Sequence, residues 1–244
     1  MNKKNFLIGL LTILMVGSST LSFASDQTIV SDTIPSLEKK VQTNYDLAKA
    51  KTALLKSQIA LKIDKNKQKA KEELDSAFTY LSEAKSTADE KTKAEIDLLK
   101  TGVTNAKKSV SLKKNDAFVK ISDVFDKTKT LSEQYNDKLN LKREKDIATF
   151  NGKYMELRAE DALLQAKIAA QSKKTYAQAQ VYLKEANEWY TRSKKYSNQK
   201  INPYVEQIQK DIEDAQTYLE KKDKEARNKI SDILQKASEL IKKD

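Results

Sequence analysis

The chain contains almost none of the residues that form tight turns. It has 4 glycines and 2 prolines among 244 residues, and Gly9 and Gly17 both lie close to its start. A β-sheet protein needs many tight turns, which depend on glycine, proline or asparagine for their backbone angles. The chain is instead rich in Lys, Glu, Ala, Leu and Gln, which lose little side-chain freedom in a helix. The composition therefore predicts an all-α fold, either a helix bundle or a helical repeat.

The sequence also repeats itself at a constant offset of 109 residues. Residues 45–131 align without a gap with residues 154–240, and 22 of the 87 aligned pairs are identical. Many other pairs exchange one apolar residue for another, as Val103 and Ile212 do. An ungapped duplication predicts two tandem helical units of similar structure. We expect about four helices in each unit, over residues 36–149 and 150–244, after a short extended segment at residues 25–35.

Within each unit, apolar residues recur every three or four positions, and polar breaks separate the runs. After the polar residues 64–67, one such stripe consists of Ala70, Leu74, Ala77, Leu81 and Ala84. A second stripe, after a break at residues 87–90, consists of Ile96, Leu99, Val103, Ala106 and Val110. Asn202 and Pro203 predict a helix start, since asparagine caps helices and proline suits the first turn. We expect a hinge at Phe150-Asn151-Gly152, after a long fourth helix in the first unit.

The first 24 residues have the pattern of a signal peptide. Lys3 and Lys4 precede the apolar run FLIGLLTILMV at residues 6–16, and Ser22-Phe23-Ala24 matches a small-x-small cleavage site. A membrane anchor is the alternative, but a spanning helix needs about 20 apolar residues, and polar residues follow this run at positions 18–20. We expect residues 1–24 to be removed after Ala24. The mature protein would then be periplasmic or secreted and would have no transmembrane segment.

The distribution of charged residues indicates which partners to expect. The formal net charge is +11, yet acidic and basic residues are interspersed, as they are along residues 220–225. Mixed charge of this kind is typical of the solvated face of amphipathic helices, so nucleic acid is not an expected partner. Weak contact with anionic envelope surfaces is an alternative use of the positive charge. A protein partner or self-association is what we expect.

The composition removes most catalytic chemistry. The chain has no histidine and no cysteine, so the usual general base, the commonest metal ligands and the thiol nucleophile are missing. It also lacks the glycine-rich loop that holds phosphates. The densest carboxylates are Glu72-Glu73 and Glu156, Glu160 and Asp161, which we expect on exposed helix surface in structural ion pairs. We predict no catalytic residue, no cofactor, no metal and no enzymatic activity.

The first helical hairpin of each unit resembles a known family. An alanine-rich helix with Ala60, a polar loop at residues 64–67 and a second helix with Ala70, Leu74 and Ala77 are repeated from Ala169 to Ala186. This arrangement resembles the repeated element of the YfdX family, although that family usually has glycine in the loop. The resemblance implies an exported, all-helical bacterial protein linked to stress tolerance, and it supplies no catalytic residues.

Aromatic residues distinguish the second unit from the first. Tyr182, Trp189 and Tyr196 are seven residues apart, and Tyr182 and Tyr196 correspond to the polar residues Glu73 and Thr87. Residues seven apart share one side of a helix, and tyrosine and tryptophan suit surfaces that become buried on binding. These three residues are therefore a candidate partner-binding seam, and internal packing within the chain is the alternative.

These observations favour an exported, non-catalytic helical protein that works by binding or in envelope stress. A surface-associated or secreted helical adhesin or structural protein is the alternative class, because it would share the export signal and the absence of catalytic residues.

Overall fold

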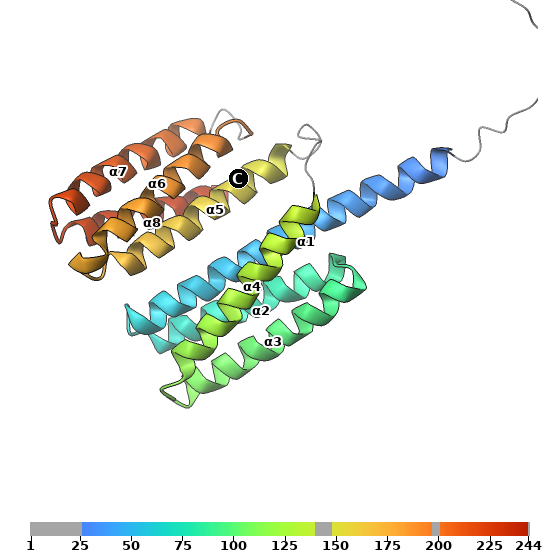
Figure 1. The fold of residues 1–244 in the computed structure, drawn as a ribbon, viewed down its shortest axis with the longest axis horizontal. Helices are drawn as coiled ribbons and strands as arrows, with labels where there is room; N and C mark the ends of the chain where they lie inside the picture. The colour runs from blue at the N-terminus through green and yellow to red at the C-terminus, as the bar shows by residue number, and fades with distance from the viewer. Residues whose placement is uncertain (1–25, 140–147, 197–200, 244) are drawn as a thin grey trace, which may run out of the picture. The chain divides into compact units, whose positions relative to one another are not determined.

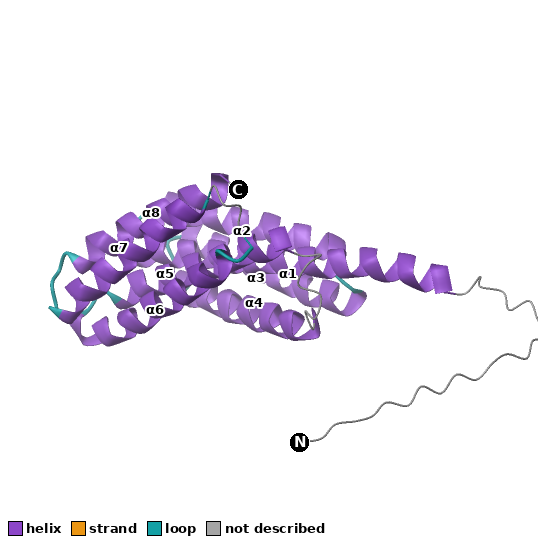
Figure 2. Ribbon diagram, turned by 90° about the horizontal axis from the view of Figure 1, so that it is seen from above, coloured by secondary structure: helices purple, strands orange, loops and turns teal. Residues whose placement is uncertain are grey.

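The computed structural model describes residues 26–139, 148–196 and 201–243. Within these ranges the chain forms helices and no strand, as Figures 1 and 2 show. In chain order they are α1 (Asp26–Lys62), α2 (Lys67–Thr87), α3 (Glu90–Ser111), α4 (Ala117–Leu139), α5 (Ala148–Ala169), the 3-10 turn η1 (Lys173–Thr175), α6 (Tyr176–Ser193), α7 (Asn202–Glu220) and α8 (Ala226–Lys243). The predicted all-α fold is thus confirmed. The predicted signal peptide, residues 1–24, lies outside the described residues.

The chain divides into two compact units, Met1–Pro35 and Ser36–Asp244. In the first of them, residues 26–35 are helical and belong to α1, so the expected extended segment is wrong there. A proline inside a helix removes one hydrogen bond, and the residues that follow Pro35 include Leu37 and Glu38, which favour helix. Both expected helical units lie within the second compact unit.

The helix ends mostly follow the polar breaks of the sequence. Asn66 Oδ1 accepts a hydrogen bond from the Lys69 amide at 2.9 Å and caps α2, and Asp89 caps α3 in the same way through Thr92. Helix α7 begins at Asn202 with Pro203 in its first turn, as predicted, but the predicted capping role of Asn202 is wrong, because Ile201 is the N-cap residue and no side chain caps this helix.

The predicted hinge is wrong, because Phe150-Asn151-Gly152 lie inside α5. The predicted continuation of α4 through residues 140–147 falls on residues that are not described. One glycine costs a helix interior only about 1 kcal/mol relative to alanine. Gly152 therefore does not end a helix whose neighbouring residues support it.

Buried positions recur at the offset of 109. The buried residues of α2 are the predicted stripe, and each has a buried counterpart in α6, at positions 179, 183, 186, 190 and 193. Leu74 and Leu183 are both fully buried. Lys113 and Lys222, which share one turn position, both have left-handed backbone angles, with φ of 55° and 52°. These correspondences support the duplication, and a close superposition of the two halves stays a prediction.

Helices α5–α8 close a four-helix bundle around one core, since α5 contacts α6 and α8, and α7 contacts α6 and α8 (Figure 1). A second core is formed by α1–α4. Leu55 and Ile59 of α1 pack into the core of α5–α8, while other residues of α1 belong to the core that it shares with α2–α4. Helix α1 therefore contributes to both cores. Accordingly, no residue of 41–60 in α1 or of 152–170 around α5 is exposed. None of the described helices has a stretch long and apolar enough to cross a membrane.

Candidate functional site

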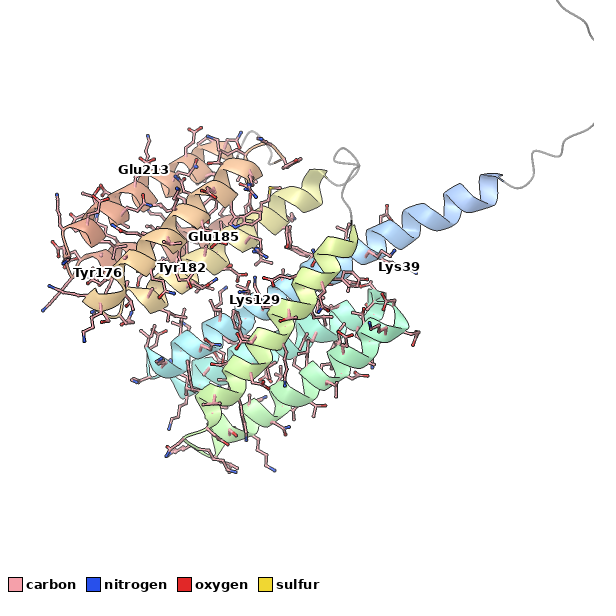
Figure 3. All side chains as sticks on the ribbon, in the orientation of Figure 1. Lys39, Lys129, Tyr176, Tyr182, Glu185 and Glu213 are labelled. Atoms are coloured by element: carbon pink, nitrogen blue, oxygen red, sulfur yellow. The ribbon has the colours of Figure 1, made fainter. Side chains whose placement is uncertain are left out.

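Only two of the three residues of the predicted aromatic seam lie on the same helix. Tyr182 and Trp189 lie on α6 and pack, half-buried, against the core of α5–α8, and Figure 3 labels Tyr182 on this helix. Helix α6 ends at Ser193, and Tyr196 follows in a turn in which its amide donates to the Ser193 carbonyl at 2.8 Å. The Ser193 hydroxyl donates to the Tyr190 carbonyl at 3.0 Å, a bond that competes with continuation of the helix. The predicted alignment of three aromatic residues on one helix is therefore wrong for Tyr196.

The other two seam residues have polar partners within the same bundle. Trp189 Nε1 donates to Glu185 Oε1 at 3.3 Å, and the guanidinium groups of Arg158 and Arg192 lie 5.1 and 4.8 Å from centroids of the Trp189 ring system. The Tyr182 hydroxyl accepts a hydrogen bond from Gln178 at 3.1 Å. Two cation–π contacts help to hold the indole ring in place. These contacts favour the internal-packing interpretation of the seam.

Helix α5 carries three buried carboxylates. Glu156, Glu160 and Asp161 are only 1%, 2% and 2% exposed, so the expectation that they lie on exposed surface is wrong. The physical reason is the position of α5, which α6 and α8 cover on one side and α1 on the other. A carboxylate beside basic residues in the sequence is usually solvated, whereas Glu160 and Asp161 are buried with Lys56 and Lys51 of α1 as their partners.

Asp161 is paired with a buried lysine of α1. The Lys51 ammonium group contacts Asp161 Oδ2, and both side chains are almost fully buried. Thr52 Oγ1 donates a hydrogen bond of 2.6 Å to Asp161 Oδ1. A buried charge needs a partner and further hydrogen bonds to offset its desolvation. This cluster supplies both, and it joins α1 to α5.

Glu160 stands beside a cleft that the sequence did not reveal. Its Oε1 atom accepts from Lys56 Nζ at 2.8 Å and from the Ser238 hydroxyl at 2.7 Å. The cleft has a volume of about 580 Å³ and is lined by residues of α1, α2, α5 and α8 and of the turn after α1. Its lining includes three lysines, three carboxylates and several apolar or aromatic side chains: Lys56, Lys69, Lys167, Asp64, Glu73, Glu160, Ile59, Tyr80, Leu164, Leu234 and Ile241.

Burial and neighbouring charges shift the pKa values of two groups in this cleft. Burial raises the pKa of Glu73 above 4.5, although the ammonium group of Lys56 opposes the shift. Burial lowers the pKa of Lys56, but the carboxylate of Glu160 outweighs it, and the Lys56 pKa lies above 10.5. Lys56 is thus held in its charged form. Glu160 accepts from both Lys56 and Ser238, which suits a structural carboxylate better than a free general base.

The cleft can therefore hold a ligand that carries charges of both signs. Glu160 is taken up by Lys56 and Ser238. Glu73, however, can meet a positive charge, Lys69 and Lys167 can meet a negative one, and the apolar side chains can cover an apolar part of the ligand. Among the described residues, no three carboxylates gather closely enough to hold a metal ion.

A separate buried carboxylate in α1 makes stability depend on pH. The Asp46 side chain is almost fully buried, accepts from Gln42 at 2.8 Å and pairs with Lys49 at 3.1 Å. Burial raises its pKa above 3.8 despite these contacts. The folded protein therefore binds this proton more tightly than the unfolded chain does.

We expect Asp46 to contribute stability below pH 3.8, its ordinary pKa, and this contribution to be lost as pH rises through the higher pKa of the folded state. The Asp46→Asn variant removes this titration and keeps a side chain of similar shape. Denaturant unfolding of both proteins from acidic to neutral pH measures the effect. The stability of the variant relative to the wild type should increase with pH, and a difference independent of pH would contradict the assignment.

Comparison with known proteins gives no relative, because no protein-family model, curated protein or solved structure matches the chain. The fold, the buried ion pairs and the cleft are the observations on which a function can be based.

Proposed function

We propose that the protein is an exported, non-catalytic binding protein of the bacterial envelope, with a role in envelope stress. The cleft lined by α1, α2, α5 and α8 is the observation that carries this proposal. Its volume of about 580 Å³ lies within the range of roughly 300–1,000 Å³ that is typical of ligand sites. Its charged groups serve recognition and helix packing.

The ligand that fits this lining best is a short peptide. Lys69 and Lys167 share one carboxylate, Asp64, each at 3.7 Å, so at least part of their positive charge is available to a ligand carboxylate. Glu73 supplies negative charge to a ligand ammonium group, and Tyr80 and Leu234 add aromatic and apolar surface. A short peptide combines these three features in one molecule.

Export rests on the sequence of residues 1–24, and the stress role rests on the YfdX resemblance of the two hairpins. The surface adhesin or spacer is the competing class. The single compact unit formed by Ser36–Asp244 supports a binder more than an extended spacer. Cell fractionation separates the two classes, since the proposal expects a periplasmic or secreted species and an adhesin would stay on the outer cell surface.

The cleft can be filled without disturbing the core. Gln235 lines the cleft and is exposed, so Gln235→Trp should occupy the space at little cost in stability. Asp232 is also exposed on α8 and is not part of the lining, so Asp232→Trp is the matched control. With a library of tripeptides as the probe, equilibrium dialysis and mass spectrometry should show retention by the wild type and by Asp232→Trp.

Gln235→Trp should lose most of that retention, while its helix content and melting temperature stay close to those of the wild type. Absence of tripeptide retention by the wild type would contradict the cleft as a peptide site. Equal retention by both variants would place the binding elsewhere on the chain.

A further inference from the structure

The turns at one end of the first four helices surround a strongly basic pocket. It lies between the α1–α2 turn and the α3–α4 turn and has a volume of about 450 Å³. Five lysines line it, namely Lys62, Lys65, Lys67, Lys113 and Lys114. The rest of the lining is Leu61, Val110, Asn115, Ala117 and Phe118, so it contains no acidic residue.

The lysines of this pocket are not paired with carboxylates at ion-pair distance, although Asp116 acts electrostatically on Lys114. Among the described residues, none of the five lysines forms an ion pair, and Lys62 Nζ lies over the Phe118 ring, 4.7 Å from its centroid. The acidic residues of the same two turns are engaged elsewhere. Asp64 lies 3.7 Å from both Lys69 and Lys167, and Asp116 pairs with Lys120 at 3.0 Å. Mutual repulsion of the five ammonium groups therefore favours the binding of an anion.

The second half of the chain provides an internal comparison at the offset of 109. There, Lys67 is replaced by Tyr176, which is buried and whose hydroxyl donates to the Asp223 carbonyl at 3.5 Å; Figure 3 labels this tyrosine at the start of α6. Phe118 is replaced by Arg227, whose guanidinium donates to the carbonyls of Ala170 and Gln171 at 2.8 and 2.7 Å. Lys114 is replaced by Asp223. The same corner is thus packed and partly neutralised in the second half, and it is basic and open in the first.

We propose that the basic pocket of the first half binds an anion that carries two or more phosphate groups. Lysine binds phosphate as a mobile point charge, and five lysines supply more charge than a single monovalent anion can balance. The edge formed by Leu61 and Phe118 can contact an apolar part of the same molecule. Free polyphosphate and lipid headgroups offer the same chemistry, and the experiment below distinguishes them. This pocket is separate from the peptide cleft and does not depend on it.

Two double variants test the pocket with equal changes in net charge. Lys65→Glu/Lys113→Glu reverses two charges that line it, and Lys174→Glu/Lys222→Glu reverses the lysines at the corresponding positions of the second half. Lys113 and Lys222 also share the left-handed backbone, so the effect of the substitution on that turn is matched, whereas Lys65 is left-handed and Lys174 lies in the 3-10 turn η1. Isothermal titration with sodium tripolyphosphate should show binding to the wild type that weakens as salt is added.

The affinity of Lys65→Glu/Lys113→Glu should fall by roughly tenfold or more, and that of Lys174→Glu/Lys222→Glu should change by no more than about twofold. Circular dichroism and melting verify that both proteins fold. If the charge reversals unfold the first variant, Lys65→Gln/Lys113→Gln provides the same test with a smaller loss of affinity.

Cosedimentation with vesicles that contain cardiolipin, whose headgroup carries two phosphates, identifies the source of the phosphate. Binding of tripolyphosphate alone supports a soluble ligand, and additional vesicle binding that Lys65→Glu/Lys113→Glu loses supports a lipid headgroup. No tripolyphosphate binding by the wild type would overturn the proposal. An equal loss in both double variants would also overturn it, because the effect would then follow net charge alone.

Discussion

The Asp161→Ala variant is expected to lower the free energy of unfolding by about 3–5 kcal/mol, the cost of leaving one partner of a buried ion pair alone. Lys51 and Asp161 have side chains that are only 6% and 3% exposed. Without the carboxylate, the Lys51 ammonium group would be buried beside Thr52, whose hydroxyl keeps only the Ala48 carbonyl, at 3.1 Å, as its acceptor. Urea unfolding of the wild type and the variant measures the loss.

The matched control removes both charges together. Lys51→Met alone should also destabilise the protein, since it leaves the Asp161 carboxylate buried without its cation. The double variant Lys51→Met/Asp161→Leu should recover most of the loss, because an apolar pair of similar volume needs no desolvation of charge. With Asp161→Leu as the second single variant, the double-mutant cycle then gives the coupling energy of the pair. A loss below about 1 kcal/mol in Asp161→Ala would show that water reaches Lys51.

Truncation of the central leucines should have a comparable effect. Leu74→Ala and Leu183→Ala are each expected to lower the free energy of unfolding by about 2–5 kcal/mol, because each leaves a cavity in a closed core. Both leucines are fully buried. Val181 lies two residues before Leu183 and is 64% exposed, so Val181→Ala should change stability by less than about 0.5 kcal/mol.

The two leucines also test whether the cores are independent. Leu74 belongs to the core of α1–α4 and Leu183 to the core of α5–α8. Residues that are far apart and share no partner usually show additive effects, within about 0.5 kcal/mol. The Leu74→Ala/Leu183→Ala variant should therefore lose the sum of the two single changes if it unfolds in one transition. Two separate transitions in the wild type would show instead that the two bundles unfold independently.

Amphipathic helices could be predicted from this sequence, whereas the central helices could not. Helices α2, α3, α6 and α7 each have one apolar stripe and one solvated face, so their spacing predicts which residues are buried. Residues 41–60 of α1 include no fully exposed residue, and only four of them are partly exposed. Lys51 in this segment has the charge expected of a solvated helix face, yet its side chain is buried against Asp161 of α5. One signal was present in the sequence, because small and apolar residues occur all around this segment: Leu47, Ala48, Ala50, Ala53, Leu54, Leu55, Ile59 and Ala60.

The sites escaped prediction because distant segments form them. The cleft joins Lys56, Glu160 and Ser238 from three helices, and no local pattern indicates which helices meet. The basic pocket likewise joins two turns that are far apart in the sequence. The aromatic seam failed for a different reason. Residues seven apart in the sequence lie on one side of a helix only if the helix includes all of them. Helix α6 ends three residues before Tyr196.

Thr52 and Asp161 touch each other although they occupy the same position of the repeat, 109 residues apart. Equivalent residues meet in this way where two like elements face each other about a two-fold axis, as in a symmetric dimer. Two copies of the first half would place Lys51 against threonine, without a carboxylate. Two copies of the second half would bring Glu160 and Asp161 of both copies together, without a cation. The charges at this contact therefore favour pairing of the first half with the second over pairing of either half with a copy of itself. This preference comes from the side chains at the contact and does not require the covalent link between the halves.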